Sequence, residues 1–279
     1  MHQTSEWTRQ AGRTLASRRR PHFAPAREVL EVYQSHIETA RQCFDMPRVL
    51  VLGATPELAD LALSSGCLVY RVDNNQAMFD AAAWRQQYPD RSNETIICGD
   101  WLNMDMIGDG MVDLVMGDAA INQIPHERMG DLFSELTRIT HPGSLFSLKQ
   151  IVMPDDKVAG YEFSKTVHAY RTDRISADEF YEILRFYCFL DEAYSADSRV
   201  LDAGKVFSAI RSRYEAGELD QDVFEFVYAR RGRLQHTVYV KTEQYSLFQS
   251  YLGDCRLVYP WRSFVYENIY NMFFITVPF

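Results

Sequence analysis

The sequence has no long apolar run, no apolar signal segment at its start and no excess of basic residues. No stretch approaches the ~18–20 apolar residues of a membrane-spanning helix, so no membrane association is expected. Without a signal peptide, we expect a cytoplasmic protein. Asp and Glu number 38 against 29 Lys and Arg, which gives a net charge of −9. Because a nucleic-acid backbone requires a cationic surface, no nucleic-acid partner is expected.

Paired-cysteine and nucleotide-binding motifs are also missing. The five cysteines lie far apart with no C-x-x-C pair, which is typical of reduced thiols and argues against a disulfide framework or a metal site. The sequence contains neither G-x-G-x-x-G nor a Walker A motif. Since a dinucleotide pyrophosphate needs those glycines, a nicotinamide cofactor is not expected.

Five short apolar runs alternate with helical patterns in the first half of the chain. The runs predict strands at 48–52, 68–72, 95–98, 112–116 and 145–152. Helices are predicted at 57–64 and 75–87, and a third has one apolar face made of Met129, Leu132, Phe133, Leu136 and Ile139. Strands that alternate with helices form a parallel sheet covered on both faces, so the predicted class is α/β.

The two ends of the chain follow other patterns. Helical spacing of apolar residues predicts peripheral helices before residue 45. Most of the aromatic residues come after residue 155, where Phe180, Ile183, Leu184 and Tyr187 predict an amphipathic helix, and the tail predicts two further strands. The expected organisation is N-terminal helices (1–45), a core (46–154), a mostly helical, aromatic-rich cap insertion (155–250) and a terminal hairpin that completes the core sheet (251–279).

Small and acidic residues follow the predicted strands, at the edge where sheets of this kind bind ligands. After the first strand, Gly53 permits close approach of a ligand, and Thr55 with the following proline predicts a helix start. Asp73 ends the second strand, where a carboxylate can accept both hydroxyls of a ribose. Asp100 ends the third strand and can accept an adenine amine, and Asp118 ends the fourth.

This ordered set resembles the class I S-adenosylmethionine-dependent methyltransferases. Five segments are similar to that family from its first motif to its fifth strand: VLGATPELADLA, VYRVDNNQAMF, ICGDWLNM, VDLVMGDAAINQIP and LTRITHPGSLFSLKQ. Val51, Thr55 and Glu57 stand where the family's first motif usually has an acid and two of its glycines, and this Gly-Ala-Thr-Pro-Glu version indicates a bacterial branch. The resemblance implies a Rossmann-like, mostly parallel sheet of seven strands with one strand reversed.

The resemblance also implies S-adenosyl-L-methionine as the cofactor, with the N-terminal helices folded over it as a lid. It places Gly53, Ala54 and Thr55 at the methionine end of the cofactor and Asp73 at its ribose. Contacts to the adenine are implied for Asp100, Trp101, Asn74 and Met78, and a contact to the sulfonium or ammonium is implied for Asp118.

The catalytic residues are less well defined. Methyl transfer from a sulfonium depends mainly on close approach in a dry pocket, and a general base is needed only for a protonated acceptor. His126, just past the fourth strand, is the best-placed base, although it can equally be a loop histidine, and His168 of the cap is a second candidate. In the topology that the resemblance implies, Asn122 and Gln123 lie beside the donor end, where an amide can hold an acceptor or the donor's carboxylate.

Three functions stay open. The principal hypothesis is methyl transfer to a small-molecule acceptor, because an aromatic-rich cap is typical of such pockets and the amino-methyltransferase signature is missing after Asp118. The alternative is a sulfonium reaction without methyl transfer, either aminocarboxypropyl transfer or cyclisation to azetidine-2-carboxylate with release of methylthioadenosine. The third is a non-catalytic binding protein. The sequence leaves the oligomeric state open.

Overall fold

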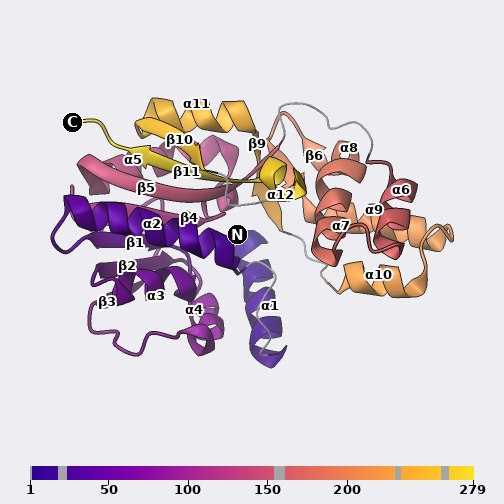
Figure 1. Ribbon diagram of the computed structural model, residues 1–279, viewed down its shortest axis with the longest axis horizontal. Helices are drawn as coiled ribbons and strands as arrows, with labels where there is room; N and C mark the ends of the chain where they lie inside the picture. Colours follow the sequence, from indigo (N-terminus) through magenta and orange to yellow (C-terminus); the bar gives the residue numbers. More distant parts are fainter. Residues whose placement is uncertain (1, 18–23, 154–160, 230–233, 259–263) are drawn as a thin grey trace.

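The computed structural model describes residues 2–17, 24–153, 161–229, 234–258 and 264–279, and it has a core built on a sheet with a mainly helical cap beside it (Figure 1). Seven core strands lie in the order β10-β11-β5-β4-β1-β2-β3. They are β1 (Arg48–Leu52), β2 (Leu68–Asp73), β3 (Glu94–Cys98), β4 (Val112–Asp118), β5 (Thr140–Met153), β10 (Asp254–Val258) and β11 (Tyr270–Thr276). Because β11 alone runs antiparallel to its neighbours in this row, the expected mostly parallel, Rossmann-like α/β sheet is confirmed.

The alternation of β1 divides the core into two apolar layers. Leu50 and Leu52 belong to the layer that contains α5 (Met129–Ile139) and α11 (Lys241–Tyr251). Val49 and Val51 belong to the opposite layer, with α2 (Arg27–Cys43) and α3 (Pro56–Ser64). Because both faces of the strand are covered, every residue after the first is buried, which explains the unbroken apolar run in the sequence.

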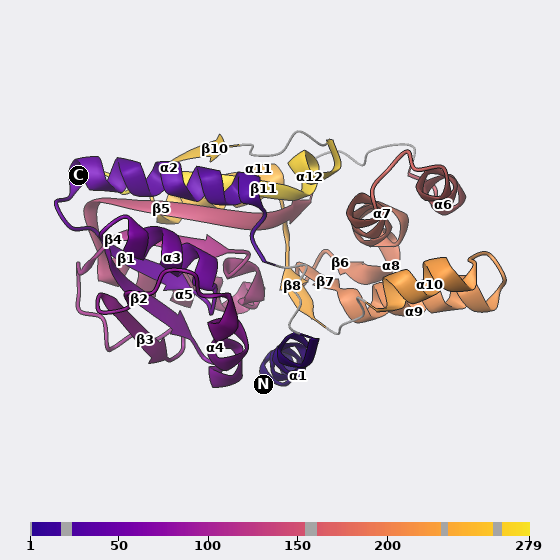
Figure 2. The same ribbon diagram turned by 60° about the horizontal axis from the view of Figure 1, so that its bottom comes forward.

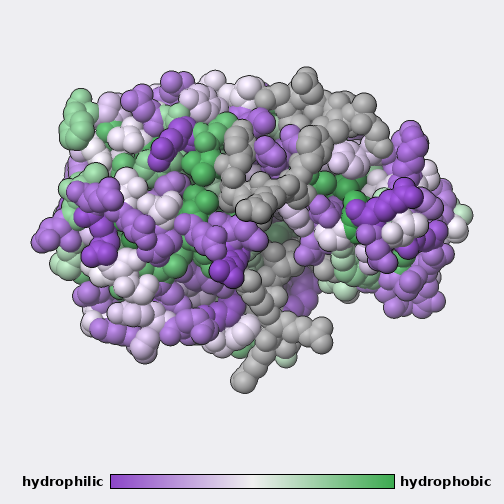
Figure 3. Space-filling view, viewed as in Figure 1, coloured by the Kyte–Doolittle hydropathy of each residue, from purple (hydrophilic) through white to green (hydrophobic). Residues whose placement is uncertain are grey.

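Helix α2 crosses the sheet and fixes the ends of its central strands. Its buried Tyr33 donates a hydrogen bond of 2.7 Å to the carbonyl of Gly117 and accepts one of 3.3 Å from the backbone N–H of Lys149. The outer side of α2 carries charged residues, and the face drawn in Figure 3 is largely hydrophilic along this helix. This amphipathic helix therefore connects β4 and β5 through Tyr33, at the edge of the sheet where ligands are expected.

The cap has its own apolar core around Phe180, Phe186 and Val206. Its elements are α6 (Phe163–Arg171), α7 (Ala177–Ile183), a π-helical turn η4 (Leu184–Cys188), α8 (Leu190–Ala193), β6 (Tyr194–Ser195), β7 (Val200–Asp202), α9 (Ala203–Glu215), α10 (Gln221–Tyr228) and β8 (Gln235–Thr237). The small sheet β6-β7-β8 was not expected from the sequence, because strands of two or three residues are too short to show a period.

The structure also differs from the expected cap boundary at residue 250. Helix α11 packs on the core, where the ring of Phe248 lies 6.0 Å from that of Phe133. The predicted boundary was based on aromatic content. Aromatic content indicates that a helix is buried, but it does not indicate whether the helix packs on the core or on the cap. Among the described residues, those of the cap therefore end near β8.

Strand β5 joins core and cap. Its 14 residues begin at Thr140, earlier than the predicted 145, and continue past the core sheet. There Ile151 pairs with Tyr270 of β11, and Val152 and Met153 pair with β9 (Tyr239–Val240). Ile151 and Met153 also pack against the apolar core of the cap, as does α12 (Phe264–Ile269) through Val265 and Ile269, so this end of β5 connects the two parts.

Helix α1 (His2–Ser17) lies outside the layers that cover the sheet and packs against α4 (Gln76–Ala82), which is followed by a short 3-10 helix η1 (Ala83–Arg85). Figure 2 shows α1 beside α4 and below the cap. Asn75, just before α4, donates a hydrogen bond of 3.1 Å from Nδ2 to Oγ1 of Thr8. In the part of the chain that the structure describes, no helix is long and apolar enough to cross a membrane.

Candidate functional site

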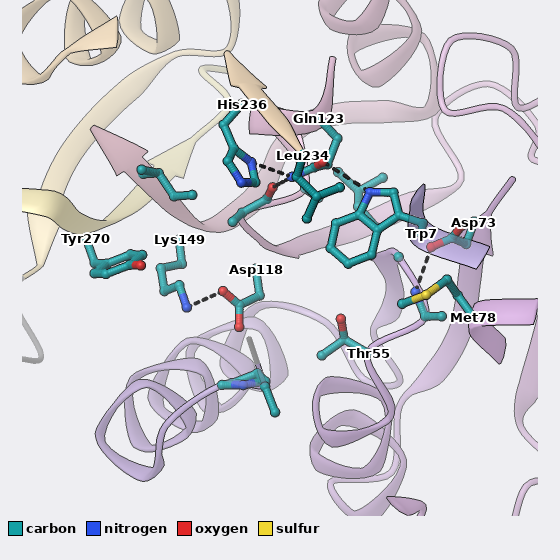
Figure 4. Close-up of a pocket in the computed structure, with 18 of the residues that line it drawn as sticks. Trp7, Thr55, Asp73, Met78, Asp118, Gln123, Lys149, Leu234, His236 and Tyr270 are labelled. Atoms are coloured by element: carbon teal, nitrogen blue, oxygen red, sulfur yellow. Dashed lines mark hydrogen bonds and ion pairs between the residues drawn. The ribbon is translucent and has the colours of Figure 1, made fainter. Parts of the chain in front are cut away.

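A cavity of about 960 Å³ lies where the carboxyl ends of the parallel strands face α1 and the cap. Figure 4 shows Asp118, Lys149 and Tyr270 on one side of it and Trp7 and Asp73 on the other. Its volume is at the upper end of the ~300–1,000 Å³ of small-molecule pockets, so it has room for a cofactor and a second molecule. The edge is also the one at which open α/β sheets bind ligands.

The loop after β1 forms the first part of the wall. Gly53 has a φ of +104°, a conformation that favours glycine, and its N–H donates a hydrogen bond of 2.7 Å to the carbonyl of Val72. Thr55 caps α3 by position, but its side chain makes no capping hydrogen bond and lines the cavity instead. The loop therefore presents backbone and a hydroxyl to a ligand.

Asp73 holds two loops together at the end of β2. Its Oδ2 accepts from the N–H of Ala54 at 3.1 Å, and its Oδ1 accepts from the N–H of Asn75 at 2.9 Å. Burial raises the pKa of Asp73, while these two hydrogen bonds and the charge of Arg71 lower it. A carboxylate fixed in this way keeps lone pairs for further donors on the cavity side.

The next part of the wall comes from the ends of β2 and β3. Trp101 donates from Nε1 to the carbonyl of Val72 at 2.7 Å, so its ring is fixed across the strand ends. Asp100 is exposed and accepts from the N–H of Leu102 at 3.0 Å. Asn74 and Met78 line the same end of the cavity. Together these side chains form a slot with a flat aromatic wall and carboxylates at its ends.

Asp118 and Lys149 form an ion pair at the centre of the cavity. Asp118 ends β4 and faces Lys149 in register on β5, and their side chains are only 4% and 10% exposed. The second oxygen of Asp118, Oδ2, is buried and has no hydrogen-bond partner among the described residues. Ala119, which follows, has a φ of 54°, a strained conformation of the kind that clusters at functional sites.

The cap supplies the opposite wall. Glu182 and Arg185 form a buried ion pair with N–O distances of 3.3 and 3.4 Å, and Tyr270 donates to Glu182 at 3.0 Å. Burial raises the pKa of Glu182, and Arg185 opposes that shift. Burial lowers the pKa of His236 to about 3, with a further contribution from Arg185, so that this imidazole is neutral.

Helix α1 closes the cavity through Trp7. Its Nε1 donates to Oε1 of Gln123 at 3.3 Å, and Nε2 of Gln123 lies 3.1 Å from Nδ1 of His236. Gln123 ends a 3-10 helix η2 (Ile121–Gln123) that follows β4. This chain of contacts connects α1, the core and the cap across one side of the cavity.

The structure brings all nine residues assigned to the cofactor from sequence into the lining of this cavity. They are Gly53, Ala54, Thr55, Asp73, Asn74, Met78, Asp100, Trp101 and Asp118.

The two catalytic candidates lie elsewhere. His126, at the start of the 3-10 helix η3 (His126–Arg128), is exposed and pairs through Nδ1 with the hydroxyl of Tyr239 at 2.7 Å. Asn122 is buried and uses its amide for hydrogen bonds of 2.7–2.9 Å to the backbone of Ile151 and Thr237. His168 of α6 is also exposed and outside the lining. Asn122 therefore positions backbone, and none of the three lines the cavity.

Sequence reasoning missed Lys149, Arg185 and Trp7. A lysine inside the apolar run of the fifth strand was the available signal for Lys149, because a buried lysine needs a partner. For Arg185 the signal was a pair of opposite charges three residues apart within an apolar helical pattern. Among the described residues, no cluster of His, Cys, Asp and Glu could hold a metal ion.

Comparisons with known proteins identify a similar sequence domain and similar folds. Residues 51–148 match a family model described as a methyltransferase domain. The fold is similar to an S-adenosylmethionine-dependent methyltransferase from Methanosarcina mazei, with a TM-score of 0.51 at 12% identity over 84% of this chain and 94% of that one. A Haloferax volcanii structure, described as a complex of the Trm112 activator with a methyltransferase, gives 0.50 at 12% identity over 99% and 98%.

Other similarities show how little the fold alone says about activity. A Rhodobacter sphaeroides structure described as a zinc-dependent alcohol dehydrogenase has a TM-score of 0.51 at 15% identity, over 90% of each chain. No curated protein sequence matches this chain significantly. The family match covers residues 51–148 and the fold agrees with it, so these residues are similar to a methyltransferase domain of the class whose cofactor is S-adenosyl-L-methionine.

Proposed function

We propose that this chain binds S-adenosyl-L-methionine in the cavity and transfers its methyl group to a small-molecule acceptor. The observation that carries the proposal is Oδ2 of Asp118, which is buried against the cavity without a partner. A buried carboxylate oxygen normally has a donor. The cofactor's ammonium is such a donor, and its carboxylate complements Lys149, so the Asp118–Lys149 pair suits the amino-acid end of the cofactor.

The other cofactor contacts follow from the strand ends. Asp73 suits the ribose hydroxyls, since its carboxylate is already fixed by two backbone N–H groups. Trp101 and Met78 provide apolar surface for the adenine. The loop from Gly53 to Glu57 is the feature by which we assign the chain to the branch of the family with this first motif.

When bound, the cofactor supplies an electrophilic methyl group on a sulfonium. The residues of the chain hold its two ends, and Trp7, Tyr181 and Tyr270 wall the space beyond and exclude water. The rings of the tyrosines also attract a cation. We propose a small acceptor because the cap and α1 both contribute to the lining of this cavity. We also place the protein in the cytoplasm, since all five cysteines are free thiols.

Calorimetry with S-adenosylhomocysteine and methylthioadenosine tests the binding mode. Methylthioadenosine keeps the nucleoside and lacks the amino-acid end. Asp118→Asn should therefore weaken binding of S-adenosylhomocysteine and leave binding of methylthioadenosine unchanged. Asp131→Asn is the matched control, because Asp131 is an exposed aspartate of α5 paired with Arg128. Equal effects of Asp118→Asn on both ligands would contradict the assignment.

Mass spectrometry of the protein incubated with S-adenosylmethionine alone tests the reaction. Retained S-adenosylmethionine or co-purified S-adenosylhomocysteine supports a methyltransferase that lacks its acceptor. Methylthioadenosine formed above the spontaneous rate would instead indicate aminocarboxypropyl transfer or cyclisation to azetidine-2-carboxylate. Binding with no turnover on any acceptor would indicate a non-catalytic binding protein.

A further inference from the structure

The cavity extends beyond the residues assigned to the cofactor, to a wall built by the cap together with α12 and β11. Tyr181 of α7, Tyr266 of α12 and Tyr270 of β11 contribute aromatic side chains to this wall, and Asp178, Glu182 and Arg185 contribute charged ones. The rings of Tyr266 and Tyr270 lie 6.1 Å apart. The acceptor has to bind at this end, because the strand ends on the other side are occupied by the proposed cofactor contacts.

Arg185 is a buried polar side chain of this wall with a hydrogen-bond donor that no described residue satisfies. It is 6% exposed, and its guanidinium packs over the rings of Tyr181 and Phe186 at 5.2 and 5.0 Å. Nη1 contacts the two oxygens of Glu182 at 3.4 and 3.3 Å, and Nε has no hydrogen-bond partner among the described residues. A guanidinium has five N–H donors and no acceptor, and the contacts of Arg185 with Glu182 and with the hydroxyl of Tyr270 still leave the Nε donor without an acceptor in the part of the chain that the structure describes.

The backbone that carries Arg185 is irregular. After α7 the helix widens to the π-helical turn η4, in which the N–H of Phe189 bonds to the carbonyl of Leu184, five residues earlier, at 3.1 Å. Such turns are rare and occur frequently at functional sites. This local departure from the α-helix is a second observation, independent of the unpartnered Nε, that marks Arg185 as a functional residue.

The unpartnered Nε of Arg185 leaves a hydrogen-bond acceptor as the missing partner, beside the carboxylates of Asp178 and Glu182 in the same lining. Glu182 is shared between Arg185 and the hydroxyl of Tyr270, which donates to it at 3.0 Å. Lys149, another cation of the lining, already pairs with Asp118. His236 is neutral in the folded protein because burial lowers its pKa to about 3. An additional acceptor of hydrogen bonds is therefore needed at Arg185, and a carboxylate matches the planar fork of a guanidinium.

We propose that the acceptor is an aromatic carboxylic acid whose ring lies among Tyr181, Tyr266 and Tyr270 and whose carboxylate binds Arg185. This proposal rests on the proposed function, since it takes the acceptor to occupy the same cavity as the cofactor. The carboxylate is the anchor and not the methylated group, because Arg185 belongs to the cap wall while the donor end lies at the strand ends. Aromatic rings stack on tyrosines in offset or edge-to-face geometry, which supplies the remaining affinity.

Calorimetry on the full-length protein saturated with S-adenosylhomocysteine tests this class. Two matched sets of probes differ only in the charged group: 4-hydroxybenzoate, 4-hydroxybenzamide and 4-hydroxybenzylamine, and indole-3-acetate, indole-3-acetamide and tryptamine. In at least one set the acid should bind at least tenfold more tightly than its amide and its amine. Arg185→Gln should abolish that preference, and Arg213→Gln, which removes an exposed cap cation paired with Glu218, should preserve it.

A double variant guards against a folding defect, because Arg185→Gln leaves Glu182 buried without its partner. Glu182→Gln/Arg185→Gln removes both charges together and should bind S-adenosylhomocysteine like the wild type, with no preference for acids. Equal binding of acid and amide in both sets, tighter binding of an amine, or an acid preference that survives in the double variant would overturn the proposal. Failure of the wild type to bind S-adenosylhomocysteine would contradict the proposed function instead, and titration of the same probes onto ligand-free protein then decides the carboxylate preference separately.

Discussion

Replacement of Asp73 by asparagine changes the charge at the proposed ribose contact and almost nothing of its size. The carboxylate accepts two backbone N–H groups, from Ala54 and Asn75, and the amide of asparagine has only one oxygen for them. One N–H then faces an amide N–H, which should lower the free energy of unfolding by about 1–3 kcal/mol. Thermal or urea denaturation of the ligand-free variant measures this loss.

The effect on ligand binding can be worked from the same contact. A hydrogen bond to a charged group contributes about 1 kcal/mol more than one to a neutral group, so two ribose hydroxyls on Asp73 should lose about 2 kcal/mol in Asp73→Asn. That corresponds to a Kd raised about 30-fold for S-adenosylhomocysteine. Because methylthioadenosine has the same ribose, its Kd should rise by the same factor in calorimetry.

A matched substitution separates this effect from a general one. Asp80→Asn makes the same chemical change on an exposed residue of α4 that bonds to Gln76, outside the cavity, and should leave both affinities unchanged. If Asp73→Asn also leaves both affinities within twofold of the wild type, the ribose does not bind at Asp73. If only S-adenosylhomocysteine is affected, Asp73 contacts the amino-acid end and the proposed orientation is reversed.

Three further predictions concern residues around the site. Asn122→Ala removes three hydrogen bonds to backbone and should lower the free energy of unfolding by about 3 kcal/mol in urea denaturation, and unchanged stability would refute its structural role. His36, whose pKa burial lowers to about 4, is neutral in the fold, so stability present above about pH 6.5 should fall by about 3 kcal/mol as the pH drops to 4. His36→Gln should lack this component in denaturation at pH 7 and pH 4.5; an identical pH slope would contradict it. Trp7→Ala should speed dissociation of S-adenosylhomocysteine about tenfold in stopped-flow measurements, equivalent to about 1.4 kcal/mol, whereas an unchanged rate would show that α1 does not retain the ligand.

The fold and one half of the site could be predicted from the sequence because both depend on local signals. Apolar runs located the parallel strands, and parallel strands bring their carboxyl ends to one edge whatever the loops do. Asp73, Asp100 and Asp118 therefore line one cavity, as their positions after three strands predicted. The sequence did not predict the length of each strand or the conformation of each turn.

The other half could not be predicted, because it depends on contacts between distant segments. Arg185 reaches the cavity through a π-helical turn, which shifts the helical period that the sequence pattern assumes. His126 and Asn122 illustrate the same limit, since a position after a strand does not fix a direction. Two short 3-10 helices leave His126 exposed on the surface and bury Asn122 against Ile151 and Thr237.

The length of β5 has a consequence for how molecules enter and leave. Because this strand continues from the core sheet until Ile151 and Met153 pack against the apolar core of the cap, a hinge opening of the cap would separate these side chains from it. Helix α1 packs on α4 and also bonds to the body through Thr8 and Trp7. A helix that packs on the outside of the core opens at a lower free energy than the core strands do. We therefore expect the turnover rate to be limited by departure of α1, with the cap acting as a fixed wall against which the acceptor is aligned.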